Sequence, residues 1–568
     1  MDINELPAEI FAFIFKHVVI SERQSSFCVE FSGTATVDTR SLIAISHVCS
    51  RWRDIALSLP FLWSRVDTTD EYKLEVFQER SRGKPLSLVV NAVYVRLNPV
   101  HRCRNFLVAC SSRLRRLDLA LGEGTYHSVD ELLRFEAPAL ECLVVSHRHI
   151  WYGEPSFSDI PRQINRLRAL AFTPLASWIP RTPLPALTHI YLSFTPSVLH
   201  LGNHTLVSLL FGTPALEHLH LSHLPSTYSV ASLWNIGIPL VQLKSLSLTD
   251  RSELSSAMNV TAGLDIPKTV LIRLDCYAAN SAADTVLPPL PYLHSVDGPT
   301  RLDVGSGFQT LHFLAEGVQA PAGVWVQAYH GALGYYDGGT LRRNWDHLLN
   351  SFATTYSFSN VLQSRFYVGS DSSKGFTDLL RYLPRLAELD LLLYLNSDAL
   401  KYGGAAVDAL TRICRALSDE SRGLCPHLHT LRVQIISATP TSPAYIGDLK
   451  RMLRARTSCG HPIRSLAVQV IDVASIDKSE LEKRRSTTVK RRSGPGDAEP
   501  GASTHSDYDL STVYAHHLAS LVDEFQFYAP QDRPFPPRTS EQWRVPGSED
   551  YWSLPERDRP VSTFPWVY

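Results

Sequence analysis

Apolar positions near the start of the chain recur at helical spacing. Ile10, Ile14 and Val18 fall on one stripe of a helix, and Phe11 and Phe15 fall on a second stripe beside it. One stripe is enough to form the core of a small module. We therefore expect the other stripe to need a separate burial site.

A second helical segment follows a polar interval. Residues 20–41 are rich in Ser and Thr and have no helical period, which predicts an inserted loop, and Asp38 or Thr39 is placed to cap the next helix. Apolar residues then return in steps of three and four, at Leu42, Ile45, Cys49, Trp52, Ala56 and Leu59. Two or three short helices cannot bury so many large side chains alone, so we expect an exposed apolar face of the kind that marks a binding surface. The alternative is that the rest of the chain covers this face.

From residue 85 the pattern becomes that of short strands. A phrase L-x-x-L-x-apolar recurs at intervals typical of leucine-rich repeats, in which each unit adds a strand and a helix or irregular turn to one shared core. The copies start at Leu114, Leu140, Leu167, Leu187, Leu216, Leu243 and Leu271, with weaker copies at Leu386, Leu428, Ile463 and Val522. Helical patterns lie between them at 376–383, 407–417 and 446–453. The predicted fold class is α/β, a helical module followed by an irregular strand–helix solenoid; the alternative is another α/β fold with leucine-rich buried strands.

The array is interrupted in places. The ninth position of each phrase lacks the Asn or Cys of the leucine-rich consensus, which predicts uneven curvature. Residues 297–360 show no clear repeat, and the glycine-rich stretch 334–339 is typical of a long loop. The predicted organisation is a helical module at 1–65, a solenoid at 66–476, a linker at 477–508, a last helix and strand at 509–528, and a tail at 529–568 rich in Pro and aromatic residues. We expect this tail to have no fold of its own, with Trp543, Trp552 and Trp566 available to hold it against the solenoid.

The composition limits the kinds of partner that the protein is expected to bind. Lys and Arg number 55 against 56 for Asp and Glu, a balance that argues against binding nucleic acid. Nine cysteines without a C-x-x-C pair are typical of reduced thiols, and neither a secretory leader nor a membrane-spanning run is evident, so we expect a cytoplasmic or nuclear protein that binds no membrane. Two basic triplets at 483–485 and 490–492 match a nuclear-localisation signal, although a solvated linker is the simpler interpretation.

The first 65 residues also carry a motif. Leu6-Pro7-x-Glu9-Ile10-x-x-x-Ile14-Phe15, then Val48-Cys49-x-x-Trp52-Arg53 and Leu62-Trp63, resembles an F-box, especially in fungal-type proteins that join this motif to a degenerate repeat region. The resemblance implies docking on the adaptor subunit of an SCF-type cullin-RING ubiquitin ligase. Carried over by position, the docking residues are Leu6, Pro7, Ile10, Ile14, Phe15, Val48, Cys49 and Trp52. The interval 20–41 departs from the family, which usually has a short connection there.

The repeats supply a second candidate surface. In each phrase the leucines point into the core, so the third and fifth positions share the opposite face of the strand. We expect that face to bind a substrate protein through Arg116, Asp118, His189, Tyr191, His218, His220, Glu388, Asp390, Thr430 and Arg432. A zinc site at His189, His218 and His220 is an alternative, although polar residues on a strand face are commoner.

No phosphate-binding loop, nucleophile elbow or zinc-protease motif occurs in the sequence. We therefore expect a protein that is not an enzyme and needs no cofactor or metal: a substrate-recognition adaptor that joins a cullin-RING ligase core to an unidentified substrate protein. Two alternatives remain. One is a leucine-rich-repeat interaction scaffold unconnected to a ligase, and the other is a hydrolase or metal enzyme within 297–360.

Overall fold

The computed structural model describes the greater part of the chain. The described residues are 3–25, 37–92, 99–121, 133–147, 163–175, 182–194, 203–224, 237–250, 257, 260–261, 263–278, 299–306, 310–317, 323–330, 349–350, 353, 358–369, 373–395, 405–419, 421, 423–437, 443–472, 510–529, 532 and 545–554. The chain divides into two compact units. The first comprises residues 1–276 and 543–560, and the second comprises residues 277–542 and 561–568.

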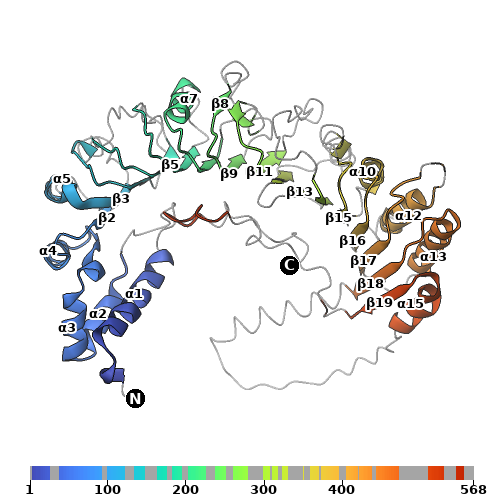
Figure 1. Ribbon diagram of the computed structural model, residues 1–568, viewed down its shortest axis with the longest axis horizontal. Helices are drawn as coiled ribbons and strands as arrows, with labels where there is room; N and C mark the ends of the chain where they lie inside the picture. The colour runs from blue at the N-terminus through green and yellow to red at the C-terminus, as the bar shows by residue number, and fades with distance from the viewer. Residues whose placement is uncertain are drawn as a thin grey trace, which may run out of the picture. The chain divides into compact units, whose positions relative to one another are not determined.

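The first unit opens with helices and continues as a sheet (Figure 1). Its helical elements are η1 (Ile3–Glu5), α1 (Ala8–Ser25), α2 (Arg40–His47), α3 (Ser50–Ser58), η2 (Pro60–Trp63), α4 (Glu71–Arg80), α5 (Pro99–Cys110), η3 (Ser111–Arg113) and α7 (Asn203–Phe211). Its strands are β1 (Arg65–Asp67), β2 (Leu86–Ala92), β3 (Leu114–Leu121), β4 (Cys142–His147), β5 (Ala169–Leu175), β6 (His189–Phe194), β7 (His218–Ser222), β8 (Ile238–Pro239), β9 (Ser245–Asp250), β10 (Leu264–Asp265) and β11 (Leu271–Ala278).

The helical segments differ from the sequence prediction at two boundaries. Helix α1 runs to Ser25, so the predicted loop at 20–41 begins too early, and residues 26–36 of that loop lie outside the described residues. The second helical pattern is two helices, because Cys49 has an extended backbone and its Sγ accepts a hydrogen bond from the Trp52 N–H as the N-cap of α3. Asp38 does act at the start of α2, where its Oδ1 accepts from the Arg40 N–H at 2.9 Å.

Parallel pairing joins β1, β2, β3, β4, β5, β6, β7, β9 and β11 in chain order. Every strong copy of the repeated phrase therefore lies in or leads into a strand, as the sequence predicted. From β3 to β9 the register sets the third positions of the phrases in one row across the strands and the fifth positions in a second row. The leucine positions between them, such as Leu117, Leu143 and Leu170, are fully buried on the other face.

The second unit begins differently. Strands β12 (Arg301–Ser306), β13 (Thr310–Glu316) and β14 (Gly323–His330) pair antiparallel in succession. The sequence analysis missed these strands within 297–360, because they carry none of the leucine phrases that identified the others. The predicted loop at 334–339 lies outside the described residues.

Beyond this segment the second unit is a parallel ladder. Strands β15 (Gln363–Gly369), β16 (Glu388–Leu395), β17 (Thr430–Ser437), β18 (Ser465–Asp472) and β19 (Glu524–Tyr528) pair in chain order, and β12 pairs parallel with β15. The intervening helical elements are α10 (Ser373–Leu379), η7 (Leu380–Tyr382), α12 (Ala405–Ser418), α13 (Pro443–Ser458), α15 (Leu510–Leu518) and η8 (Ala519–Leu521). The three helices predicted from apolar spacing in this half of the chain are thus present.

Candidate functional site: the helical module and the polar face of the strands

The aromatic stripe of α1 forms the core of the helical module. Phe11 and Phe15 are both fully buried, and their ring centroids lie 5.2 Å and 5.3 Å from the ring centroid of Trp52 on α3. Ala56 of α3 accepts a hydrogen bond from the Trp63 indole at 2.9 Å, which joins η2 to the same core. Elements α1, α3 and η2 therefore pack against one another through these aromatic side chains.

The other stripe of α1 remains open to solvent. Ile10 is 46% exposed and Val18 is 38% exposed, while Ile43 on α2 and Val48 after it are 52% and 59% exposed. The sequence predicted that one stripe would stay uncovered, and the structure confirms this for the described residues. Unpaired apolar surface of this kind marks a binding face.

Contacts between helices bring the two halves of the motif together. The Arg51 guanidinium on α3 donates to the Leu6 carbonyl at 2.8 Å and lies 5.7 Å from the Phe11 ring centroid. The residues just before α1 are therefore held against α3, which begins two residues after Val48.

The eight predicted docking residues divide by exposure. Pro7, Ile10 and Val48 are exposed; Leu6, Ile14, Cys49 and Trp52 are partly buried; Phe15 is fully buried. Phe15 therefore supports the face from within the core. That these residues dock a ligase adaptor stays a prediction.

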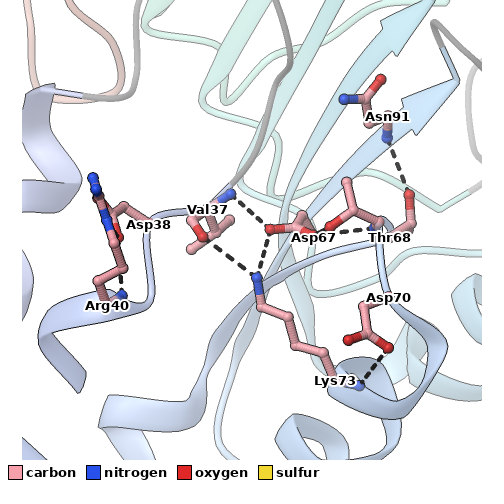
Figure 2. Close-up of polar contacts among 9 residues, drawn as sticks. Val37, Asp38, Arg40, Asp67, Thr68, Asp70, Lys73 and Asn91 are labelled. Carbon is pink, nitrogen blue, oxygen red and sulfur yellow. Dashed lines mark hydrogen bonds and ion pairs between the residues drawn. The ribbon is translucent and has the colours of Figure 1, made fainter. Parts of the chain in front are cut away.

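A buried carboxylate fixes the chain just before α2 (Figure 2). Asp67 of β1 has no exposed surface, and its Oδ2 accepts from the Val37 N–H at 2.7 Å and from Lys73 Nζ at 2.8 Å. Lys73 Nζ also donates to the Val37 carbonyl at 3.4 Å. Both polar groups of the Val37 backbone are thus held by this pair, so the approach to α2 is anchored to β1 and α4.

The same pair sets the charge state of Asp67. Burial alone would raise the pKa of this carboxyl, but hydrogen bonds from Lys73, Thr69 and the Val37 N–H outweigh it and hold the pKa below its ordinary value. Asp67 therefore remains a carboxylate at neutral pH.

Residues 3–69 match the F-box-like family. The helical module is an F-box-like domain. F-box domains bind the adaptor subunit of SCF ubiquitin ligases, and the F-box expected from the motif is confirmed. No curated protein matches the chain. No helix among the described residues is long and apolar enough to cross a bilayer.

The predicted polar rows are present in the first unit, but they are buried. Arg116 aligns with Cys142, Ala169, His189 and His218 in one row, and Asp118, Tyr191 and His220 belong to the next row. Asp118 is 1% exposed, Tyr191 has no exposed surface, and the three histidines are between 5% and 7% exposed. The sequence analysis expected an open face. Residues 545–554 of the tail cover Arg116, His189 and the small residues between them, and Trp552 is one of the aromatic residues expected to hold the tail against the strands.

The histidines of these rows pair with different neighbours. The rings of His189 and His218 lie 4.5 Å apart, whereas His220 stacks on Tyr191 at 4.7 Å. In the described part of the chain no three His, Cys, Asp or Glu side chains gather as metal ligands, so the zinc alternative gains no support. Burial and the neighbouring His189 lower the pKa of His218 to about 4.

In the second unit the predicted residues do meet. Arg432 donates to Asp390 at 2.9 Å and to Glu388 at 3.1 Å. Arg365, which the sequence analysis missed, donates to the same Asp390 from two nitrogens at 3.1 Å and 3.0 Å. With Asp303 on β12, the row alternates in charge as Asp303, Arg365, Asp390 and Arg432. Burial raises the pKa of Asp303 to about 7. Asp303 and Arg365 could not be picked out from the sequence, because β12 and β15 lack the leucine phrase that identifies the third position.

Proposed function

We propose that this protein is the substrate-recognition subunit of an SCF-type cullin-RING ubiquitin ligase. The F-box-like domain docks on the ligase adaptor, and the strand ladders, which we interpret as an irregular leucine-rich-repeat solenoid, bind a substrate protein. The chain itself performs no bond chemistry and acts by raising the local concentration of substrate at the ligase. The proposal places it in the cytoplasm or the nucleus, where such ligases and reduced thiols occur.

One observation carries the ligase part of this proposal. Ile10 on α1 and Val48, which follows α2, stay exposed, although Phe11, Phe15 and Trp52 already form the core of the module. A domain that only supported the rest of the chain would turn this stripe inward. The parallel strands spaced by one repeat length support the solenoid interpretation.

A pull-down with matched variants tests the proposal. Val48→Asp places a charge in the exposed face, and Val241→Asp does the same outside the F-box-like domain; the two valines are 59% and 64% exposed. Tagged wild type and Val241→Asp should retain adaptor and cullin from a cell extract, while Val48→Asp should lose at least nine-tenths of both.

Two results would argue against a ligase subunit. If both variants retain the adaptor equally, Val48 is not part of the docking face. If the adaptor is retained and cullin never is, the chain is an interaction scaffold outside the ligase.

A further inference from the structure

We propose that strands β3–β6 form a binding face for a turned peptide segment that carries a Tyr-Trp pair. Residues 545–554 of the same chain occupy this face, so a substrate segment of the same chemistry binds by displacing them. This inference rests on the proposed function for its biological role, since it names the class of segment that the adaptor would recognise.

The indole of Trp552 fills a gap in the polar rows. Its neighbours are the small side chains of Cys142, Ala169 and Ala171, together with Val144 and Tyr191, and Trp552 is only 4% exposed. Larger residues at these positions would leave no room for an indole. The small residues and the tryptophan are therefore complementary in size.

Polar side chains at either side hold the backbone of the segment. Arg116 Nη1 donates to the Tyr551 carbonyl, and His189 Nε2 donates to the Gly547 carbonyl at 2.8 Å. Carbonyl groups are present in every peptide, so these two contacts are open to segments from other proteins. The face thus combines a general backbone grip with one specific aromatic position, as other peptide-binding surfaces do.

Further contacts favour a tyrosine before the tryptophan. The Tyr551 ring lies 4.8 Å from the His189 ring, and the Tyr551 hydroxyl hydrogen-bonds with Arg168. Glu549 and Asp550 precede it in a turned stretch, where the Ser548 N–H donates to the Val545 carbonyl and the Asp550 N–H donates to the Gly547 carbonyl, both at 3.1 Å. Gly547 has a φ of +88°, and a Cβ there would lie 3.4 Å from His218 Nε2, so the bend that leads into the acidic pair favours glycine.

Tethering explains why the tail would occupy the face in the absence of a partner. A segment on the same chain acts at a high effective concentration, so it competes with a free peptide without binding tightly itself. Weakening the tail should therefore uncover the face for a peptide added in solution.

The test measures binding of a fluorescein-labelled peptide of residues 545–554 to the full-length protein by anisotropy. Trp552→Ala protein should bind the peptide at least tenfold more tightly than wild type, and a peptide carrying the same substitution should bind neither. Adding Arg116→Met together with Asp118→Asn to the Trp552→Ala protein should weaken binding at least tenfold; the second change avoids leaving the Asp118 carboxylate buried without its Arg116 partner. Arg115→Met is the matched control, because Arg115 pairs with Glu141 and its side chain is 59% exposed, and this change should have no effect.

The proposal is overturned if wild type and Trp552→Ala protein bind the peptide equally, or if the two arginine variants behave alike. Should a variant fail to fold by circular dichroism, a protease site inserted within 533–544 of the wild-type chain replaces it. After cleavage, excess unlabelled peptide should release the C-terminal fragment, and a fragment that the peptide cannot release would refute the proposal. Adaptor pull-down from the same preparations separates the two ideas: adaptor retained without peptide binding refutes only this inference, and peptide binding without adaptor refutes only the ligase role.

Discussion

Replacing Lys73 with Met tests whether the buried pair with Asp67 anchors the F-box-like domain. The substitution keeps the apolar stem of Lys73 and removes the ammonium that lies 2.8 Å from Asp67 Oδ2. Asp67 would then remain as a buried carboxylate held by the Val37 N–H and by Thr69. Methionine cannot donate to the Val37 carbonyl either, so the approach to α2 loses two contacts.

The structure sets the size of the effect. Removing one partner of a buried ion pair costs about 3–5 kcal/mol. The Lys73 side chain is 19% exposed, so water can reach the carboxylate and the lower end, about 3 kcal/mol, applies. At about 1.36 kcal/mol per factor of ten, backbone amides over 37–47 should exchange with deuterium roughly 150-fold faster.

Hydrogen exchange read by mass spectrometry on a peptide covering 37–47 measures this directly. Arg40→Met is the control, because Arg40 pairs with Asp38 through a side chain that is 90% exposed, and exposed pairs contribute less than about 1 kcal/mol. Asp67→Asn added to Lys73→Met removes the stranded charge and should restore part of the protection. Equal exchange in Lys73→Met and Arg40→Met, or no recovery in the double variant, would refute the anchor.

Three further outcomes are expected. Trp52→Ala should remove the partner of Phe11 and Phe15, destabilise the F-box-like domain by about 3–5 kcal/mol and lower its calorimetric transition, whereas Val48→Asp at the surface should leave that transition unchanged. Arg365→Met should destabilise the second unit more than Arg432→Met in urea unfolding, because the side chains are 8% and 35% exposed and only Arg365 holds Asp390 with two nitrogens; equal effects would contradict this. Lowering the pH from 7 to 5 should reduce the protection of amides in 545–554, measured against an unfolded peptide at the same pH, by about tenfold: the folded pKa of His218 is about 4, so protonation below the ordinary value near 6.5 favours the open state. The protection that Asp67 gives 37–47 should persist over that range, because its lowered pKa means that stability is lost only as the pH falls below about 3.9, and a parallel change in both segments would show a general acid effect instead.

The elements that the sequence predicted well are those fixed by local periodicity. Strands β3–β7 follow phrases such as the one at Leu114, because alternation forces one face inward and proline ends the preceding helix. The two stripes of α1 differ in burial as expected. The Phe11 and Phe15 side chains are larger than those of the stripe that contains Ile10, and they fill the space between the helices. Strands β12–β14 were missed because their partners are antiparallel neighbours, and pairing of that kind needs no repeat length.

The cover of the polar rows was beyond the reach of local periodicity. The third and fifth positions at Leu140 and Leu167 are Cys142, Val144, Ala169 and Ala171, which are apolar in rows that are elsewhere polar. That change of character was visible in the sequence, and it signals that something apolar rests there. Which segment fills the gap is a contact between residues about 400 positions apart, as between Arg116 and Tyr551, and neither period nor composition specifies such a pairing.

The two buried polar arrangements of the first unit answer one physical requirement in different ways. A strand face that carries Arg116 and His189 cannot be covered by apolar residues alone, because each polar group then loses water without gaining a partner. At the β1 edge the requirement is met by Lys73 and the Val37 backbone; across β3–β6 it is met for Arg116 by Asp118 and the Tyr551 carbonyl, and for His189 by the Gly547 carbonyl. The first seal is made by an ion pair on adjoining elements, so opening it strands a buried charge. The second is completed by a segment far along the chain, and another peptide that offers the same carbonyls and indole can replace it while Arg116 keeps its pair with Asp118. Residues 545–554 are therefore expected to give way to another peptide at β3–β6, whereas the Asp67–Lys73 pair is expected to stay intact.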